Sequence, residues 1–138
     1  MSEFFHNYLG YLLARSSFNT SSELHQRFKQ EGVSVLTWRI LAAVQESSKT
    51  VNQLAALVLV NQSTLSKALD RLETEGLLQR SQNQLQKRKT NISVTTKGRR
   101  LISKLVPIAQ QYEQHSFSQL NENEKTTLRK ILKKLLDD

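Results

Sequence analysis

TVNQLAALVLVNQSTLSKALDRLETEGLL, residues 50–78, is the stretch of sequence that decides the fold. It holds two short helical patterns, and too few residues join them for anything but a sharp turn. In the second pattern the apolar residues recur at i, i+3, i+4 and i+7, which places them on one stripe of a helix: Leu65, Ala68, Leu69 and Leu72. The stretch therefore predicts a helix-turn-helix in which one face of the second helix packs and the other is free.

The free face of that second helix has a distinct order of chemistry. Small hydrogen-bonding side chains come first, and cations follow: Gln62, Ser63, Thr64, Ser66, Lys67 and Arg71. A helix that enters a DNA major groove needs donors and acceptors that can meet base edges, together with cations that can meet guanine or phosphate. An ordinary amphipathic surface helix also has a polar outer face, so this pattern alone leaves both interpretations open.

The positive charge of the chain is concentrated in one segment. The formal net charge is +8, and residues 61–100 carry nine Lys or Arg against three Asp or Glu, a local excess of +6. A concentrated positive field attracts polyanions, either nucleic acid or an anionic membrane. A membrane-binding segment would place its cations on one amphipathic helix, whereas the densest cluster here, Lys87 to Lys89, lies in a stretch without helical periodicity. The distribution favours nucleic acid.

Composition excludes several other classes of protein. A chain of 138 residues suits one domain with a sizeable core, and the lack of cysteine excludes disulfides and thiolate metal sites. No apolar run nears the roughly 18 residues of a membrane span, and residues 1–11 lack a signal pattern, so we expect an unprocessed cytoplasmic protein. His6, His25 and His115 have no metal-ligand spacing. Without a phosphate loop, nucleophile elbow or paired catalytic carboxylates, we expect no enzyme and no cofactor.

Helical patterns precede the helix-turn-helix. Residues 3–31 keep a helical rhythm that the weak helix formers at 16–17 and 19–22 interrupt, which leaves one long helix or two. Gly32 is placed as a stop, and Ser34 as the cap of a helix that runs to about Glu46. Thr50 and Gln53 match a capping box, so the next helix should start at Val51. Val58 to Val60 would form the turn, and Asn61 would cap the helix after it.

A change of period after Gly76 predicts a wing. Residues 77–82 and 90–95 alternate as two short strands, with a polar loop at 82–89 between them. Thr96 is the expected cap of a long helix from about Lys97, which Pro107 should bend or divide. Asn121 should cap the last helix, residues 122–136. We expect a core made of residues from all these elements: Trp38, Leu54, Val60, Leu65, Leu69, Leu72 and Val94.

Over essentially its whole length the chain resembles the MarR family of winged-helix transcription regulators. Three segments carry the resemblance: LTWRILAAV at 36–44, NQLAALVLVNQSTLSKALDRLETEGLL at 52–78, and NISVTTKGRRLI at 91–102. The family commonly has Asp-Arg-Arg at the wing tip, where this chain has Gln86, Lys87 and Arg88. It also usually has Gly in the turn, where this chain has Leu59, so the turn could be shaped differently.

The resemblance implies a mainly α fold with a two- or three-stranded β wing. The winged helix-turn-helix would span residues 34–100 of a single chain of 138, and residues 1–31 and 101–138 would form dimerisation helices. It also implies a homodimer on double-stranded DNA, usually a repressor. The apolar stripes near both termini fit a second copy, because large apolar patches are rare on a monomer, although they could also bury against each other within one chain. A two-fold axis would set the recognition helices about 34 Å apart on a near-palindromic operator.

The candidate DNA contacts lie on three segments. Gln62, Ser63, Thr64, Ser66 and Lys67 are the candidates for base edges and nearby phosphates, and Arg71 is the candidate for a phosphate. Asn52 and Gln53 at the start of the preceding helix could offer donors to another phosphate. Arg88, flanked by Lys87 and Lys89, is the candidate for the minor groove, or else a solvated loop cation. The other cations of this region would do no more than add to the positive electrostatic field: Arg80, Lys97, Arg99 and Arg100.

A small-molecule effector follows mainly from the resemblance. Tyr8, Tyr11, Arg15 and Trp38 could line a cleft for an aromatic or anionic molecule, although core and dimer packing explain the same residues. The alternative function is a winged-helix module that binds protein or RNA.

Overall fold

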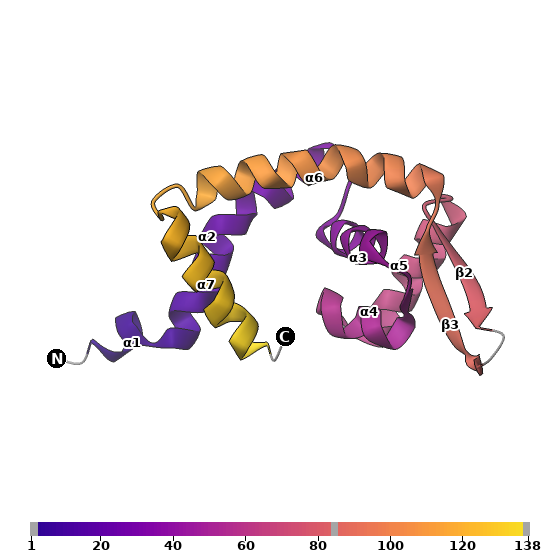
Figure 1. The fold of residues 1–138 in the computed structure, drawn as a ribbon, viewed down its shortest axis with the longest axis horizontal. Helices are drawn as coiled ribbons and strands as arrows, with labels where there is room; N and C mark the ends of the chain where they lie inside the picture. The colour runs from indigo at the N-terminus through magenta and orange to yellow at the C-terminus, as the bar shows by residue number, and fades with distance from the viewer. Residues whose placement is uncertain (1–2, 84–85, 137–138) are drawn as a thin grey trace. The chain divides into compact units, whose positions relative to one another are not determined.

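The structure is a computed structural model that describes residues 3–83 and 86–136, with the backbone alone for residues 82, 83 and 86–89. Seven helices and three short strands follow one another along this part of the chain (Figure 1). They are α1 (Phe4–Asn7), α2 (Leu9–Gln30), α3 (Val35–Glu46), β1 (Lys49–Thr50), α4 (Val51–Val58), α5 (Gln62–Thr74), β2 (Leu78–Asn83), β3 (Gln86–Val94), α6 (Thr96–Ser116) and α7 (Glu122–Leu135). The predicted class, mainly α with a small sheet, is confirmed.

The chain divides into two compact units. We call His25–Ile108 the central unit, and Met1–Leu24 with Ala109–Asp138 the terminal unit. Helices α2 and α6 each contribute residues to both units.

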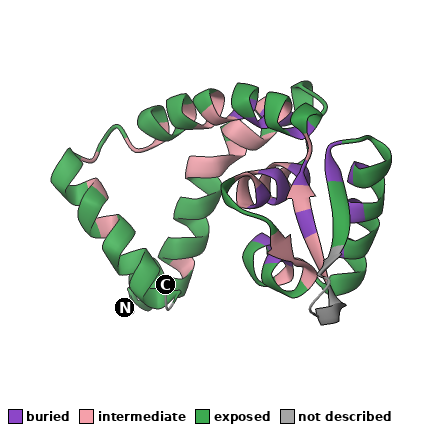
Figure 2. Ribbon diagram, turned by 45° about the vertical axis from the view of Figure 1, so that its right-hand side comes forward, coloured by how far each residue is buried: buried purple, intermediate pink, exposed green. Residues whose placement is uncertain are grey.

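The central unit holds the hydrophobic core. Its fully buried side chains come from α2, α3, α4, α5, β3 and α6, and the largest of them are Phe28, Ile40, Leu41, Leu54, Leu65, Leu69, Leu72, Ile92, Ile102 and Leu105 (Figure 2). Five of the seven expected core residues are buried. Trp38 and Val60 are only partly buried, because Trp38 packs on Phe28 at the margin of the core and Val60 lies in the turn.

The sheet of the central unit has three antiparallel strands in the order β1-β3-β2. Strand β1, which the sequence did not predict, is a two-residue segment that pairs Lys49 with Ile92. The expected strand boundaries were wrong at the far end of the hairpin. Strand β2 reaches Asn83 and β3 starts at Gln86, so most of the segment expected as a polar loop at 82–89 belongs to strands. Gln82 pairs with Thr90 and Asn83 with Gln86, and an irregularity in the register lies between these two pairs. The hydrogen bonds of a hairpin are made by the backbone, so polar side chains do not prevent strand pairing. The polar composition of residues 82–89 was therefore not a reliable sign of a loop.

The structure decides the open prediction for residues 3–31 and corrects the start of the long helix. Residues 3–31 form two helices, α1 and α2, which are separated at Tyr8. Helix α2 runs unbroken through the weak formers, where the hydroxyls of Thr20, Ser21 and Ser22 donate to carbonyls one turn back. Helix α6 is capped by Thr95 rather than Thr96, since Thr95 Oγ1 accepts from the Gly98 N–H over 3.0 Å. Pro107 does not divide α6, which runs unbroken from Thr96 to Ser116.

Most of the other predicted helix ends are confirmed, although α4 includes Val58, which was expected in the turn, and α7 ends at Leu135. Ser34 caps α3 by accepting from Thr37 N, and Gly32 ends α2 with a φ of +76°. Asn121 and Glu124 form a capping box at α7. These local signals are strong because each supplies a partner for a backbone group that a helix end leaves free, or a conformation that only glycine adopts without strain.

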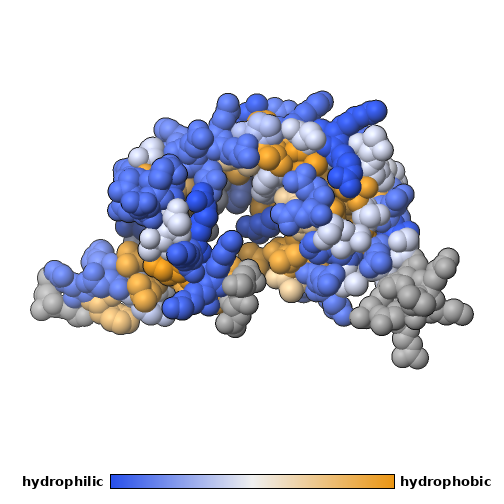
Figure 3. All heavy atoms as spheres, viewed as in Figure 1, coloured by the Kyte–Doolittle hydropathy of each residue, from blue (hydrophilic) through white to orange (hydrophobic). Residues whose placement is uncertain are grey.

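The terminal unit has no core of its own. Among its described residues, 3–24 and 109–136, none is buried. Large apolar side chains are exposed on it instead: Phe4, Phe5, Tyr8, Leu9, Leu12, Leu13, Phe18, Ile131, Leu132, Leu135 and Leu136. Figure 3 shows hydrophobic surface at the N-terminal end of this unit. In the described part of the central unit, only Leu57 and Leu59 belong to this class.

Candidate nucleic-acid interface

Helices α4 and α5 form the predicted helix-turn-helix. Thr50 and Gln53 make both hydrogen bonds of a capping box at the start of α4, and the side chain of Asn61 caps α5 by accepting from Thr64 N over 2.8 Å. Between the two helices Leu59 has a φ of 63° and a ψ of 37°, the left-handed conformation that glycine adopts most easily. The turn therefore keeps a left-handed residue although no glycine is present.

Helix α5 presents the two faces that its sequence predicts. Leu65, Ala68, Leu69 and Leu72 are buried against the central unit. The candidate reading residues of its first turns are all exposed: Gln62, Ser63, Thr64, Ser66 and Lys67. The structure thus brings these five together on one outward surface, with no competing core role.

A hydrogen bond joins the start of α5 to the start of α4. The Gln62 amide donates from Nε2 to Asn52 Oδ1 over 3.0 Å, so two of the predicted contact residues touch each other. Gln53 is exposed at the same helix start, but its Oε1 accepts from Thr50 N in the capping box. Asn52 is thus placed beside the reading face, whereas the carbonyl oxygen of Gln53 already has a structural partner.

The second half of α5 is held to its neighbours by polar contacts. Arg71 donates to Thr37 Oγ1 on α3 over 2.9 Å and lies 3.3 Å from Glu75 Oε1. Asp70 pairs with Arg80 of β2 at 2.9 Å. Arg71 is therefore not simply a free surface cation, and Arg80, expected only to add to the field, fixes α5 to the sheet. Sequence reasoning missed Thr37, whose partner on α5 lies 34 residues away.

The predicted wing contacts fall at the end of the hairpin. The backbone of residues 87–89 belongs to strand β3, as the N-terminal part of Gln86–Val94. The side chains of Lys87, Arg88 and Lys89 lie outside the described residues. Their role stays a prediction.

The first turns of α6 add cations to the central unit. Lys97 donates to the backbone carbonyl of Glu75 over 2.7 Å, which ties α6 to the end of α5. Arg99 and Arg100 are exposed. Lys97 thus has a structural partner, while the two arginines contribute charge at the surface.

The predicted effector residues belong to different units. In the terminal unit, Arg15 donates to the Tyr11 hydroxyl over 3.0 Å and Tyr11 packs on Phe5 with the ring centroids 4.1 Å apart, while Tyr8 stacks on Phe4. Trp38 belongs to the central unit, where its ring centroid lies 5.0 Å from that of Phe28. Each aromatic side chain thus has a packing partner of its own.

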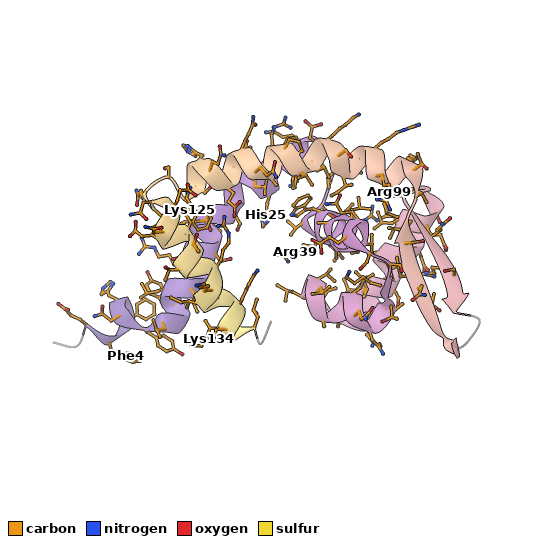
Figure 4. All side chains as sticks on the ribbon, viewed as in Figure 1. Phe4, His25, Arg39, Arg99, Lys125 and Lys134 are labelled. Atoms are coloured by element: carbon orange, nitrogen blue, oxygen red, sulfur yellow. The ribbon has the colours of Figure 1, made fainter. Side chains whose placement is uncertain are left out.

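The central unit also has a surface hollow that the sequence did not indicate. It is formed where α2 ends and α3 begins, has a volume of about 540 Å³, and its polar lining includes His25, Lys29 and Ser34. Burial lowers the pKa of His25 below its ordinary value of 6.5, and the positive charge of Arg39 on α3 lowers it further (Figure 4). The ammonium group of Lys29 in this hollow can attract a small anion.

The part of the chain that the structure describes has neither a cluster of metal ligands nor a membrane-spanning helix. Within residues 3–83 and 86–136, no three His, Cys, Asp or Glu side chains gather as metal ligands. None of the described helices is long and apolar enough to cross a bilayer.

Comparison with known proteins supports the interpretation of the helix-turn-helix. The family model described as MarR family matches residues 31–89. The regulator PecS of Dickeya dadantii, described as an HTH-type transcriptional regulator, is 32% identical over 124 residues, which cover 87% of this chain and 75% of PecS.

Solved structures share the fold over nearly the whole chain. A MarR family transcriptional regulator from Silicibacter pomeroyi aligns with a TM-score of 0.89 and 29% identity, covering 99% of this chain and 93% of the other. BpsR of Bordetella bronchiseptica, whose structure concerns the regulation of DNA binding by 6-hydroxynicotinic acid, aligns with a TM-score of 0.86 and 24% identity, covering 100% and 99% of the two chains.

Proposed function

Because this chain belongs to the MarR family of transcriptional regulators, we propose that it binds specific sequences of double-stranded DNA with α5 in the major groove. It is a regulator and not an enzyme. One observation carries the proposal: the first turns of α5 expose amide, hydroxyl and ammonium groups, while the opposite face of the same helix is fully packed. A helix so fixed can present hydrogen-bonding groups to base edges in a constant orientation.

The wing and the cations of the central unit would contact the same duplex as α5. Lys87, Arg88 and Lys89 would lie over the minor groove next to the major groove that α5 enters, and Asn52 and Arg71 would meet phosphates at its edges. The +6 excess of residues 61–100 supplies the attraction for the backbone.

The active species is a homodimer in this proposal. The terminal unit exposes eleven large apolar side chains and buries none of its described residues. A single chain would therefore leave a large apolar surface in contact with water, which is rare in monomeric proteins. A second copy would cover this surface by an isologous contact and place two α5 helices about 34 Å apart, on half-sites of a near-palindromic operator. Such a protein would act in the cytoplasm, usually as a repressor.

A small molecule would release the DNA in this proposal. The DNA binding of BpsR, which has the same fold, is regulated by 6-hydroxynicotinic acid. In this chain two places offer cations to an acidic ligand: Arg15 beside Tyr11 in the terminal unit, and Lys29 in the hollow of the central unit. Titration of the DNA complex with aromatic carboxylates, using Arg15→Ala and Lys29→Ala as a matched pair, tests which cation matters. If the carboxylate releases DNA equally from both variants and from wild type, neither place is the ligand site.

Selection from random duplexes tests the main proposal. We expect the purified protein to enrich a near-palindromic sequence from random double-stranded DNA, with two half-sites about one helical turn apart, and to shift that duplex in a gel as a dimer. Enrichment of no duplex at low salt would overturn the proposal. Binding of an RNA or a protein instead would assign the winged helix to the alternative function.

A further inference from the structure

Thr37 is the only buried polar residue among the described residues, with 4% of its surface exposed. It lies in the first turn of α3, and its hydroxyl oxygen receives hydrogen bonds from two sides. Arg71 Nη2 donates to it over 2.9 Å, and Ser34 Oγ lies at 3.0 Å. The threonine hydroxyl thus connects the cap of α3 to the recognition helix α5.

The guanidinium of Arg71 makes two polar contacts within the protein and still has donors left. One contact goes to Thr37, and the other goes to Glu75 over 3.3 Å. A guanidinium has five N–H donors, so about three stay free. The Arg71 side chain keeps 50% of its surface exposed, which leaves those donors accessible to an anion.

From this geometry we infer that Thr37 is a positioning residue for DNA binding: it holds the Arg71 guanidinium at the edge of α5 in the orientation that meets a phosphate. The inference rests on the proposed function. A free arginine side chain would lose rotamer entropy on binding, and an arginine already held in place loses less. Thr37 contributes to affinity through this preorganisation, without touching the DNA.

The two partners of Arg71 are unequal in this role. Thr37 is buried in α3, so its hydroxyl has a fixed position relative to the core. Glu75 is on the same helix as Arg71, with 46% of its side chain exposed, and exposed pairs of this kind contribute little. Glu75 is therefore the matched control: Glu75→Gln should leave DNA affinity within about twofold of wild type.

A double-mutant cycle tests the inference. The probe is the duplex that wild type enriches, and its affinity is measured by fluorescence anisotropy at several salt concentrations for wild type, Thr37→Val, Thr37→Ser, Arg71→Ala and Thr37→Val/Arg71→Ala. We expect Thr37→Val to bind about three- to tenfold more weakly, because the side chain must be ordered on binding. Thr37→Ser keeps the hydroxyl and should bind as wild type does.

The salt dependence separates positioning from charge. Thr37→Val removes no cation, so the slope of log affinity against log salt should match wild type, whereas Arg71→Ala should flatten it by about one phosphate. In the Arg71→Ala background, Thr37→Val should cost nothing further, because its effect acts through Arg71.

Several results would overturn the inference. Wild-type affinity in Thr37→Val, with only a lower unfolding midpoint, would make Thr37 a structural residue and nothing more. An equal loss of affinity with and without Arg71 would show that Thr37 does not act through Arg71, which also contradicts the inference. Should Thr37→Val fail to fold, Arg71→Lys replaces it: it keeps the charge but not the fork, so wild-type affinity in this variant counts against the inference. If wild type binds no duplex, the proposed function fails instead.

Discussion

The Gln62 side chain donates a hydrogen bond to Asn52 Oδ1 over 3.0 Å, and so joins the first turn of α5 to the first turn of α4. This bond leaves the Gln62 carbonyl oxygen and one N–H free, which are the two groups that a bidentate contact with adenine requires. Asn52 therefore orients Gln62, which we propose as a reading residue, in addition to any contact that Asn52 itself would make with the DNA backbone.

Asn52→Ala should weaken the preference for one base pair by about 1 kcal/mol, because Gln62 loses its orientation. Selection from random duplexes with the variant would show a relaxed position in each half-site, and Gln62→Ala should relax the same position further. An unchanged preference in Asn52→Ala would limit Asn52 to a contact between helices.

Lys67→Ala should change which sequences are preferred. Lys67 is exposed on the outward face of α5, where an ammonium can meet guanine O6 and N7. Comparison of the sequences enriched by wild type and variant measures this. A uniform loss of affinity on all duplexes would instead assign Lys67 to a phosphate.

Arg88→Ala should weaken operator binding and flatten its salt dependence by about one phosphate. Lys104→Ala is the matched control, because it removes the same charge from an exposed position of α6 outside the helix-turn-helix and the wing. The measurement is a titration of the operator at several salt concentrations. Equal slopes for Arg88→Ala and wild type would remove the wing tip from the interface.

Gly98→Ala should destabilise the central unit by about 1–3 kcal/mol, the cost of an overpacked contact. A Cβ at Gly98 would lie 2.3 Å from the backbone oxygen of Leu77 and 2.6 Å from Val94 Cγ2, so α6 or the sheet must shift. Ser103→Ala, at an exposed position of the same helix, should stay within about 0.5 kcal/mol of wild type. Urea unfolding of both variants measures the difference, and equal midpoints would show that the packing yields.

The stability of the protein should fall as the pH drops below about 6.5. The folded state holds His25 below its ordinary pKa, so the unfolded chain binds the proton first, and stability decreases as pH falls from 6.5 through the lowered pKa. His25→Gln should remove this part of the pH dependence, which denaturant titrations between pH 5 and 8 would show as a flatter profile. An identical profile in the variant would assign the loss to other groups.

Local sequence signals predicted most of the fold. Helix caps such as Ser34, Asn61 and Asn121 were found because a cap and its partner lie three residues apart. The stripe of α5 was found because periodicity depends only on spacing. The strand end at Gln86 was missed, since hairpin pairing is made by the backbone and polar side chains do not oppose it.

The contacts that fix the interface could not be predicted in the same way. The bond between Arg71 and Thr37 joins residues 34 positions apart, and the pairing of Arg80 with Asp70 crosses from β2 to α5. No local pattern specifies either, because each depends on how helices and strands pack in three dimensions. Gln62 and Asn52 were both predicted as contact residues, but their bond to each other was not.

The left-handed conformation of Leu59 shows that this turn can form without glycine. The capped start of α5 and the buried Val58 hold the backbone on both sides, and Leu59, with 74% of its surface exposed, accepts a strain of about 1–2 kcal/mol. A sequence pattern that insists on glycine here would overlook relatives whose backbone follows the same path, so searches for such regulators should score the flanking caps and stripes instead.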